Sequence, residues 1–194
     1  LKPVVAIYST FLQRGYDQFI HDVCLENIDV TFAIDRAGIV GEDGPTHTGS
    51  FDISFMRCIP NIVISCPSNE HELWHLLNIC YEHKGPAAIR YPRGSGIGVK
   101  PIPNEIEGFE IGKAKKIKDG QSVCILNFGV LMNQIDQIAE KKDYTLYDMR
   151  FIKPIDQDAL EHAMQHETII TLEDNTLLGG CGSAIGEKLH KQKF

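Results

Sequence analysis

Residues 30–49, VTFAIDRAGIVGEDGPTHTG, join a short apolar run to a polar loop. The run at 30–34 has the length and the β-branched and aromatic content of a buried strand. Glycine and proline exclude a regular element from the loop at 35–49, yet this loop carries aspartate, arginine, histidine and two threonines. Ligands bind at the carboxyl edge of open parallel sheets, so we interpret the loop as functional; a solvated turn without a ligand is the plainer alternative.

Short strand-like runs alternate with longer segments of helical period along the whole chain, which predicts parallel sheets with crossover helices. The predicted strands lie at 4–8, 30–34, 61–65, 87–91, 109–117, 122–128, 144–149 and 168–172. The predicted helices lie at 11–25, 51–56, 69–81, 131–141, 156–165 and 183–190. We expect the strand at 4–8 to be buried. Asn69, with Glu72 three residues later, fits a capping box at the start of a helix.

Glycines and prolines between residues 93 and 108 interrupt this pattern. The sequence therefore predicts an α/β protein with two consecutive parallel-sheet domains, at 1–98 and 108–194. Residue 1 is not methionine, and a strand begins almost at once. We expect a piece of a longer protein.

Charge and composition narrow the class of partner. Lysine and arginine total 19 against 26 aspartates and glutamates, a net charge of −7, which argues against a nucleic-acid partner. No apolar run is long enough for a membrane span, and the N-terminus lacks the features of a signal peptide, so we expect a cytoplasmic location and no membrane partner. The six cysteines form no C-x-x-C pair, and we expect buried free thiols.

Three polar clusters follow predicted strands, at residues 8–14, 35–49 and 90–94. Because the carboxyl ends of parallel strands meet at one edge of a sheet, we expect these clusters to converge there. They supply aromatic faces, an aspartate and histidine pair and several guanidinium groups. Arginine forks suit a phosphate dianion, so the residues predict a small phosphorylated ligand.

Two further motifs have a plainer interpretation. His71-Glu72-Leu73-Trp74-His75 matches the H-E-x-x-H pattern of zinc hydrolases, but no third ligand is evident, and we interpret it as an exposed helix face. Gly179-Gly180-Cys181-Gly182-Ser183 precedes a predicted helix and could hold an anion on its backbone N–H groups. No lysine follows to make a P-loop, so we favour close packing around these glycines.

The clusters at 8–14, 35–47 and 90–94 resemble the 1-deoxy-D-xylulose-5-phosphate synthase family of transketolase-like thiamine-diphosphate enzymes. The Gly-Glu-Asp-Gly-Pro-Thr-His segment at 41–47 is shared with transketolases generally. The lead-in at 35–41 and the Arg-Tyr-Pro-Arg-Gly segment at 90–94 indicate the synthases. Further stretches that resemble the family are 57–61, 148–154 and 179–183, so the likeness covers nearly the whole chain.

This resemblance implies a transketolase-like fold, with the pyrimidine-binding domain at 1–98, incomplete at its N-terminus, and the C-terminal domain at 108–194, incomplete at its C-terminus. It also implies large apolar patches on this chain, where the absent domains would pack. It also implies the condensation of pyruvate with D-glyceraldehyde 3-phosphate, with loss of CO₂, to 1-deoxy-D-xylulose 5-phosphate, a precursor in isoprenoid and thiamine biosynthesis. The cofactors would be thiamine diphosphate and Mg²⁺, and the enzyme would be a homodimer. The N-terminal domain that binds Mg²⁺ and the family's catalytic glutamate would lie outside this chain, which alone would be inactive.

The resemblance also assigns roles residue by residue. Phe11 would stack on the aminopyrimidine ring of the cofactor, and Arg14 would make a polar contact near it. Asp43 and His47 would be catalytic and would face the hydroxyl and aldehyde oxygens of the acceptor, with His47 available for proton transfer. The residues that would hold the phosphate of the acceptor are Tyr8, Arg36 and Arg93.

Three alternatives remain at this point. The β subunit of a 2-oxoacid dehydrogenase carries these two domains on its own chain. A true transketolase shares the segment at 41–47, although the lead-in at 35–41 argues against it. A phosphate-binding regulatory module without catalytic activity is the alternative outside enzymes.

Overall fold

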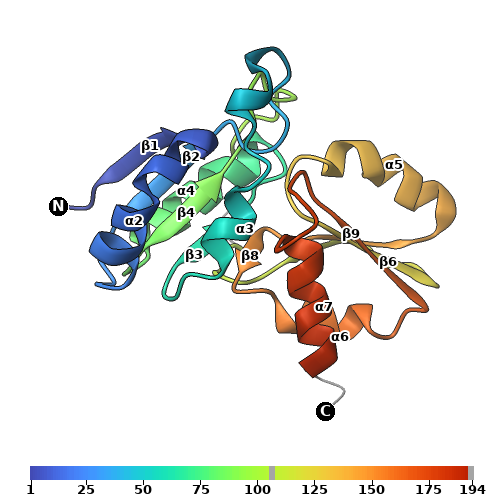
Figure 1. The fold of residues 1–194 in the computed structure, drawn as a ribbon. Coiled ribbons are helices and arrows are strands. Elements are labelled where there is room, and N and C mark those ends of the chain that lie inside the picture. Colours follow the sequence, from blue (N-terminus) through green and yellow to red (C-terminus); the bar gives the residue numbers. More distant parts are fainter. Residues whose placement is uncertain (105–107, 192–194) are drawn as a thin grey trace.

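Two β-sheets lie side by side in the computed structural model, which describes residues 1–104 and 108–191 (Figure 1). The first has five strands in the order β1-β2-β4-β3-β8, and the second has four in the order β5-β7-β6-β9. Most neighbouring strands are parallel, and each sheet ends in one antiparallel edge strand, β8 or β5. The expected α/β fold class with two consecutive sheets is confirmed.

The first sheet takes four of its strands from the first half of the chain. These are β1 (Val4–Tyr8), β2 (Thr31–Asp35), β3 (Val63–Ser65) and β4 (Ala87–Arg90), all close to their predicted positions. The fifth, β8 (Phe151–Lys153), comes from the second half and pairs with β3. The sequence did not predict β8, because this strand forms by pairing with β3 from the other half of the chain, a tertiary contact that the local pattern does not show.

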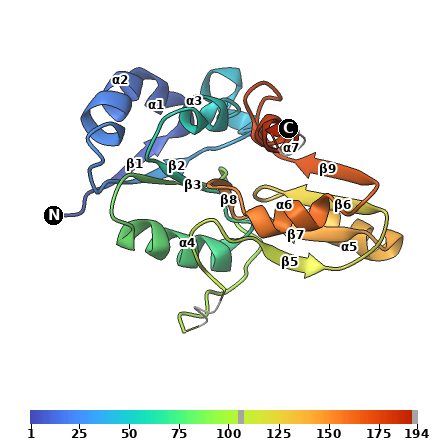
Figure 2. The same ribbon diagram turned by 90° about the horizontal axis from the view of Figure 1, so that it is seen from below.

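Helices cover both faces of this sheet. Figure 2 shows α1 (Ser9–Leu12), α2 (Tyr16–Gln18) and α3 (Asp52–Arg57) on one face and α4 (Glu70–Glu82) on the other. The helix predicted at 11–25 is helical from Ser9 to Cys24 but changes type along its length, with a 3₁₀ segment η1 (Gln13–Gly15) before α2 and a π segment η2 (Phe19–Cys24) after it. The side chain of Asn69 accepts from the backbone N–H of Glu72 at 3.0 Å, which confirms Asn69 as the N-cap. The Glu72 carboxylate bonds to Arg150 and does not complete the predicted capping box.

The second sheet contains β5 (Lys115–Lys118), β6 (Val123–Asn127), β7 (Thr145–Asp148) and β9 (Thr168–Leu172). Its helices are α5 (Met132–Lys142), α6 (Gln157–Ala163) and α7 (Cys181–Lys191). The strand predicted at 109–117 is wrong over its first part. Phe109 packs against α4, and the N–H of Ala114 donates to the Asp156 side chain at 2.8 Å, so this stretch is not bonded into the sheet.

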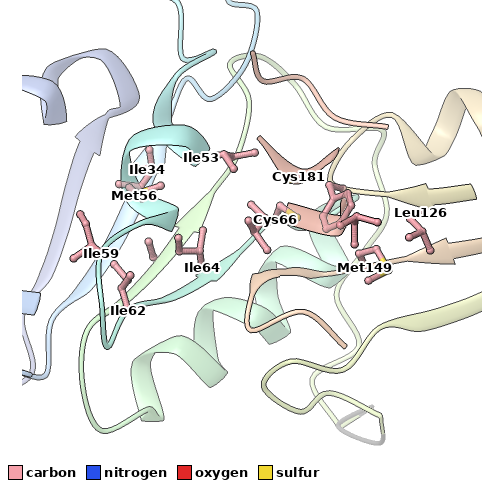
Figure 3. Packing of buried hydrophobic residues seen from close by; sticks show 14 of the residues in the cluster. Ile34, Ile53, Met56, Ile59, Ile62, Ile64, Cys66, Leu126, Met149 and Cys181 are labelled. Atoms are coloured by element: carbon pink, nitrogen blue, oxygen red, sulfur yellow. The ribbon is translucent and has the colours of Figure 1, made fainter. Parts of the chain in front are cut away.

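One hydrophobic core runs through both halves of the chain. Figure 3 shows Ile64 of β3 and Cys66 beside it, followed by Met149 and Cys181 from the second half. All four side chains are buried. The two sheets are therefore joined by shared packing as well as by β8.

Burial differs from expectation at two places. Val4 is 51% exposed, because β1 is the edge strand of its sheet, so the buried strand expected at 4–8 is wrong. Five of the six cysteines are buried free thiols as expected, but Cys58 is exposed. Large apolar side chains, among them Ile39, Leu177 and Leu178, face solvent. The expected large apolar patches stay a prediction. Within the described residues, no helix combines the length and apolarity needed to cross a membrane.

Candidate active site

The carboxyl ends of β1, β2 and β4 lie next to one another in the first sheet. Tyr8 at the end of β1 is in register with Asp35 at the end of β2, and Ile34 is in register with Arg90 at the end of β4. The loop after β2 and the segment after β4 then run side by side at the top of Figure 1. The three polar clusters therefore share one edge, as the sequence predicted.

The loop after β2 is closed at its base by a pair of glycines. The N–H of Gly38 donates to the carbonyl of Gly49 at 3.1 Å, and the N–H of Gly49 donates back at 2.8 Å. A Cβ at Gly49 would overlap the carbonyl oxygen of Arg36, so a larger residue does not fit there. Between these glycines lie two short 3₁₀ turns, η3 (Gly41–Asp43) and η4 (Pro45–His47), which carry the functional side chains.

Two arginines from different loops meet on one carboxylate. Nε of Arg36 lies 2.7 Å from Oδ2 of Asp43, and Nε of Arg93 lies 2.9 Å from Oδ1. Desolvation by itself would raise the pKa of the Asp43 carboxyl, but the hydrogen bond from Arg36 and the nearby positive charges outweigh it and lower that pKa. Asp43 therefore stays ionised and holds both guanidinium groups in place.

An aromatic group adjoins this charged cluster. The rings of Tyr8 and Phe11 stack with centroids 5.2 Å apart, and the ring of His47 meets Phe11 edge-on at 5.6 Å. The guanidinium carbon of Arg36 lies 3.8 Å from the centre of the Tyr8 ring. Phe11 is 40% exposed, so part of its ring is open to a planar ligand.

The structure thus joins six of the seven predicted site residues through direct contacts. These six are Tyr8, Phe11, Arg36, Asp43, His47 and Arg93. The seventh, Arg14, lies exposed on η1, and the contacts that join the six do not include it in the described part of the chain.

A cavity of about 630 Å³ opens beside this cluster. Tyr91, Pro92 and Arg93 line it on one side, and the first residues of α4 line another. The second half of the chain also lines this cavity, through Val130 just before α5 and Asn133 in its first turn. Arg93 therefore connects the charged cluster to a space between the two halves.

The two remaining motifs take part in internal contacts. The side chains of Glu72 and His75 are buried, so the exposed helix face expected for residues 71–75 is wrong. Glu72 pairs with Arg150 at 2.7 Å, and Nε2 of His75 lies 3.0 Å from the carbonyl oxygen of Ile102. This face of α4 is covered by the segment after β4 and by the turn after β7.

At the second motif, the backbone N–H groups of Cys181 and Gly182 donate to the Glu173 carboxylate at 2.8 and 2.9 Å. The helix N-terminus binds a side chain of its own protein, consistent with the packing interpretation. Within residues 1–104 and 108–191, no cluster of three or more histidine, cysteine, aspartate or glutamate side chains could hold a metal ion.

Sequence reasoning missed a buried charge cluster beneath the site. Arg90 contacts Asp52 at 3.1 Å and Asp174 at 2.6 Å. These residues are far apart in the sequence, and Asp174 belongs to the other half of the chain. The signal that could have found it is the polar run after β9, which resembles the runs after β2 and β4.

Comparison with known proteins gives the family of each half. The family model "Transketolase, pyrimidine binding domain" matches residues 1–97, and "Transketolase, C-terminal domain" matches residues 112–194. Two curated relatives, both named 1-deoxy-D-xylulose-5-phosphate synthase, come from Francisella tularensis subsp. novicida and Idiomarina loihiensis. They are 57% and 54% identical to this chain and cover 96% and 100% of it. The chain spans only 30% and 31% of their length.

Solved structures agree with these matches. "Split gene transketolase, inactive beta4 tetramer" has a TM-score of 0.88 and 25% identity, over 98% of this chain and 64% of that one. A transketolase from Campylobacter jejuni has a TM-score of 0.68 over 97% of this chain and 33% of that one; at 18% identity it shows the shared fold alone. The chain therefore belongs to the transketolase family, whose pyrimidine-binding and C-terminal domain models match it in succession.

Proposed function

We propose that this chain is part of a thiamine-diphosphate-dependent synthase that condenses pyruvate with D-glyceraldehyde 3-phosphate, with loss of CO₂, to form 1-deoxy-D-xylulose 5-phosphate. The observation that carries the proposal is the meeting of Arg36 and Arg93 on Asp43, beside the stacked rings of Tyr8 and Phe11. Two relatives with this name are 57% and 54% identical to the chain, against 25% for the split-gene transketolase, which supports a synthase over a transketolase.

Arg36 and Arg93 would bind the phosphate of the acceptor. Each uses its Nε on Asp43, and Arg36 also donates from Nη1 to Asp35 at 2.8 Å. A guanidinium group has five N–H donors, so each arginine keeps donors for phosphate oxygens. Arg93 also lies 3.3 Å from Glu42, an exposed carboxylate that a phosphate dianion would displace. The two arginines come from different loops and would hold the phosphate from two sides.

Asp43 and His47 would act on the other end of the acceptor. Nδ1 of His47 lies 3.0 Å from the hydroxyl of Thr46, which leaves Nε2 to exchange a proton with a substrate oxygen. The Asp43 carboxylate is ionised and can accept a hydrogen bond from an acceptor hydroxyl. The acceptor would thus be fixed by its phosphate at one end and protonated at the other.

Phe11 would bind the aminopyrimidine ring of thiamine diphosphate. Its partly exposed ring, supported by Tyr8 from behind, fits a flat heterocycle. When bound, this cofactor supplies the electron sink for the decarboxylation of pyruvate. Arg14, which is exposed on η1, would approach the same ring from the solvent side.

The remainder of the enzyme completes this proposal. We assign the Mg²⁺ ligands, the diphosphate site and the catalytic glutamate to a domain or chain outside these residues, so that the chain alone is inactive. We further propose that the enzyme is a homodimer and that it lies in the cytoplasm. The six free thiols and two substrates of central metabolism are consistent with this location.

The test uses the full-length protein. Incubation with pyruvate and D-glyceraldehyde 3-phosphate should yield 1-deoxy-D-xylulose 5-phosphate, identified by mass spectrometry, together with CO₂. Arg36→Ala or Arg93→Ala should mainly raise the KM for the acceptor, and Lys116→Ala, an exposed charge on β5, is the control. Acceptor kinetics that stay unchanged while cofactor binding, measured by calorimetry, is lost would contradict the phosphate role.

A further inference from the structure

Three charged side chains, two of them buried and one partly buried, lie beneath the candidate active site. Arg90, the last residue of β4, is 4% exposed, and its Nε lies 3.1 Å from both carboxylate oxygens of Asp52 at the start of α3. Its Nη1 donates to Oδ1 of Asp174 at 2.6 Å. Asp52 and Arg90 belong to the first half of the chain, whereas Asp174 follows β9. The second half therefore contributes a carboxylate directly below a site that the first half builds.

Asp174 supports both loops that carry the charged part of the site. Through Arg90 it holds the end of β4, three residues before Arg93. Its other oxygen, Oδ2, packs against Gly38 so closely that a Cβ at this position would overlap it. Gly38 adopts φ +74° and closes the base of the loop at 36–49. One carboxylate therefore touches the bases of two loops whose tips meet at the proposed phosphate site.

The segment that carries Asp174 is itself fixed to the first half of the chain. Its backbone makes a series of hydrogen bonds with the start of α3 and the residues around it. These run from Thr176 N to Ser50 O (2.8 Å), from Ser54 Oγ to Leu178 O (2.7 Å) and from Arg57 Nε to Gly179 O (2.7 Å). The carboxylate of Asp174 is therefore held at a defined place, as a positioning role requires.

We propose that Asp174 is a positioning residue for the acceptor phosphate site, an inference that rests on the function proposed above. It holds the end of β4 and the base of the loop at 36–49 so that Arg93 and Arg36 face the same point. The second half of the chain is then needed for acceptor affinity although none of its residues touches the phosphate in this proposal.

Asp174→Asn is a suitable test because it should leave the fold intact. Asp52 still pairs with Arg90 in this variant, so no buried cation is left without a carboxylate. Asp158→Asn is the matched control, since Asp158 is an exposed carboxylate in the first turn of α6 and pairs with Lys113 at 2.6 Å. Both variants are made in the full-length protein.

Two measurements are needed. In steady-state kinetics, Asp174→Asn should raise the acceptor KM by roughly three- to thirtyfold and leave the pyruvate KM unchanged. In hydrogen exchange followed by mass spectrometry, peptides over 36–50 and 90–94 should exchange faster, and a peptide over β6 should not. Asp158→Asn should change neither quantity.

The outcomes separate this inference from the proposed function. If the wild-type protein does not form the expected product, the proposed function fails, and hydrogen exchange alone decides whether Asp174 holds the two loops. If Asp174→Asn lowers the melting temperature but leaves both the acceptor KM and the exchange of 36–50 at wild-type values, Asp174 has only a general structural role and the inference is overturned.

Discussion

Replacing Arg150 by methionine is expected to destabilise the chain strongly, because it breaks a buried ion pair between the two halves. Nε and Nη2 of Arg150 donate to the two oxygens of Glu72 at 2.7 and 2.8 Å, and both side chains are almost fully buried. Nη1 donates to the carbonyl of Gly108 at 2.6 Å, and the guanidinium group lies 4.0 Å from the centre of the Phe109 ring. Methionine keeps most of the volume but none of these polar contacts.

The expected loss follows from what is left behind. Breaking a buried pair by removing one partner costs about 3–5 kcal/mol. The neighbouring Asp148 carboxyl is also buried, so the Glu72 and Asp148 carboxyl groups would both remain without the Arg150 cation. For a chain of this length, about 2–4 °C of melting temperature is lost per kcal/mol, or roughly 6–20 °C in all.

Urea unfolding of the 194-residue chain measures this loss. The single tryptophan, Trp74, lies on α4 two residues from Glu72 and reports the transition by fluorescence. The double variant Glu72→Met with Arg150→Met removes both charges and should recover most of the stability. A loss below about 1 kcal/mol in Arg150→Met, or a double variant as unstable as the single one, would refute the reasoning.

Three further outcomes are expected. Burial and the charge of Glu72 raise the pKa of Asp148 to about 7. A carboxyl whose pKa is higher in the folded than in the unfolded state stabilises the fold more as the pH falls. The free energy of unfolding should therefore rise as the pH is lowered from 8 to 5 in the wild type, and not in Asp148→Asn. Asn69→Ala removes the N-cap of α4 and should cost about 1 kcal/mol in urea unfolding. In calorimetry of the full-length protein, Phe11→Ala should weaken thiamine diphosphate binding more than Arg14→Ala, because the Phe11 ring is joined to the site through Tyr8 and His47 and the exposed Arg14 is not.

Much of the fold was predictable because its strands are apolar runs bounded by turn residues. The strands at 4–8 and 168–172 match β1 and β9 residue for residue. Errors arose where tertiary contacts override the local pattern. Phe109 is of a residue type common in strands but packs on α4. Residues 151–153 form β8 because they reach the edge of the other sheet.

The candidate site was predictable as far as neighbouring strand ends could be identified. Tyr8 ends β1, and Asp43 and Arg93 follow β2 and β4. These three strands are neighbours in the sheet, and the carboxyl ends of parallel strands meet at one edge, which brings the three residues together. Asp174 follows a strand of the second sheet, and its contact with Arg90 depends on how the two halves pack against each other. The periodicity of the sequence does not predict that packing.

The central claim is that Arg36 and Arg93 recognise the phosphate of the acceptor. The most direct measurement compares kcat/KM for D-glyceraldehyde 3-phosphate with that for D-glyceraldehyde, in the full-length wild-type protein and in Arg36→Ala with Arg93→Ala. We expect the wild type to prefer the phosphorylated acceptor and the double variant to lose most of that preference, with little change in the rate on D-glyceraldehyde. A double variant that keeps the wild-type preference would contradict the claim.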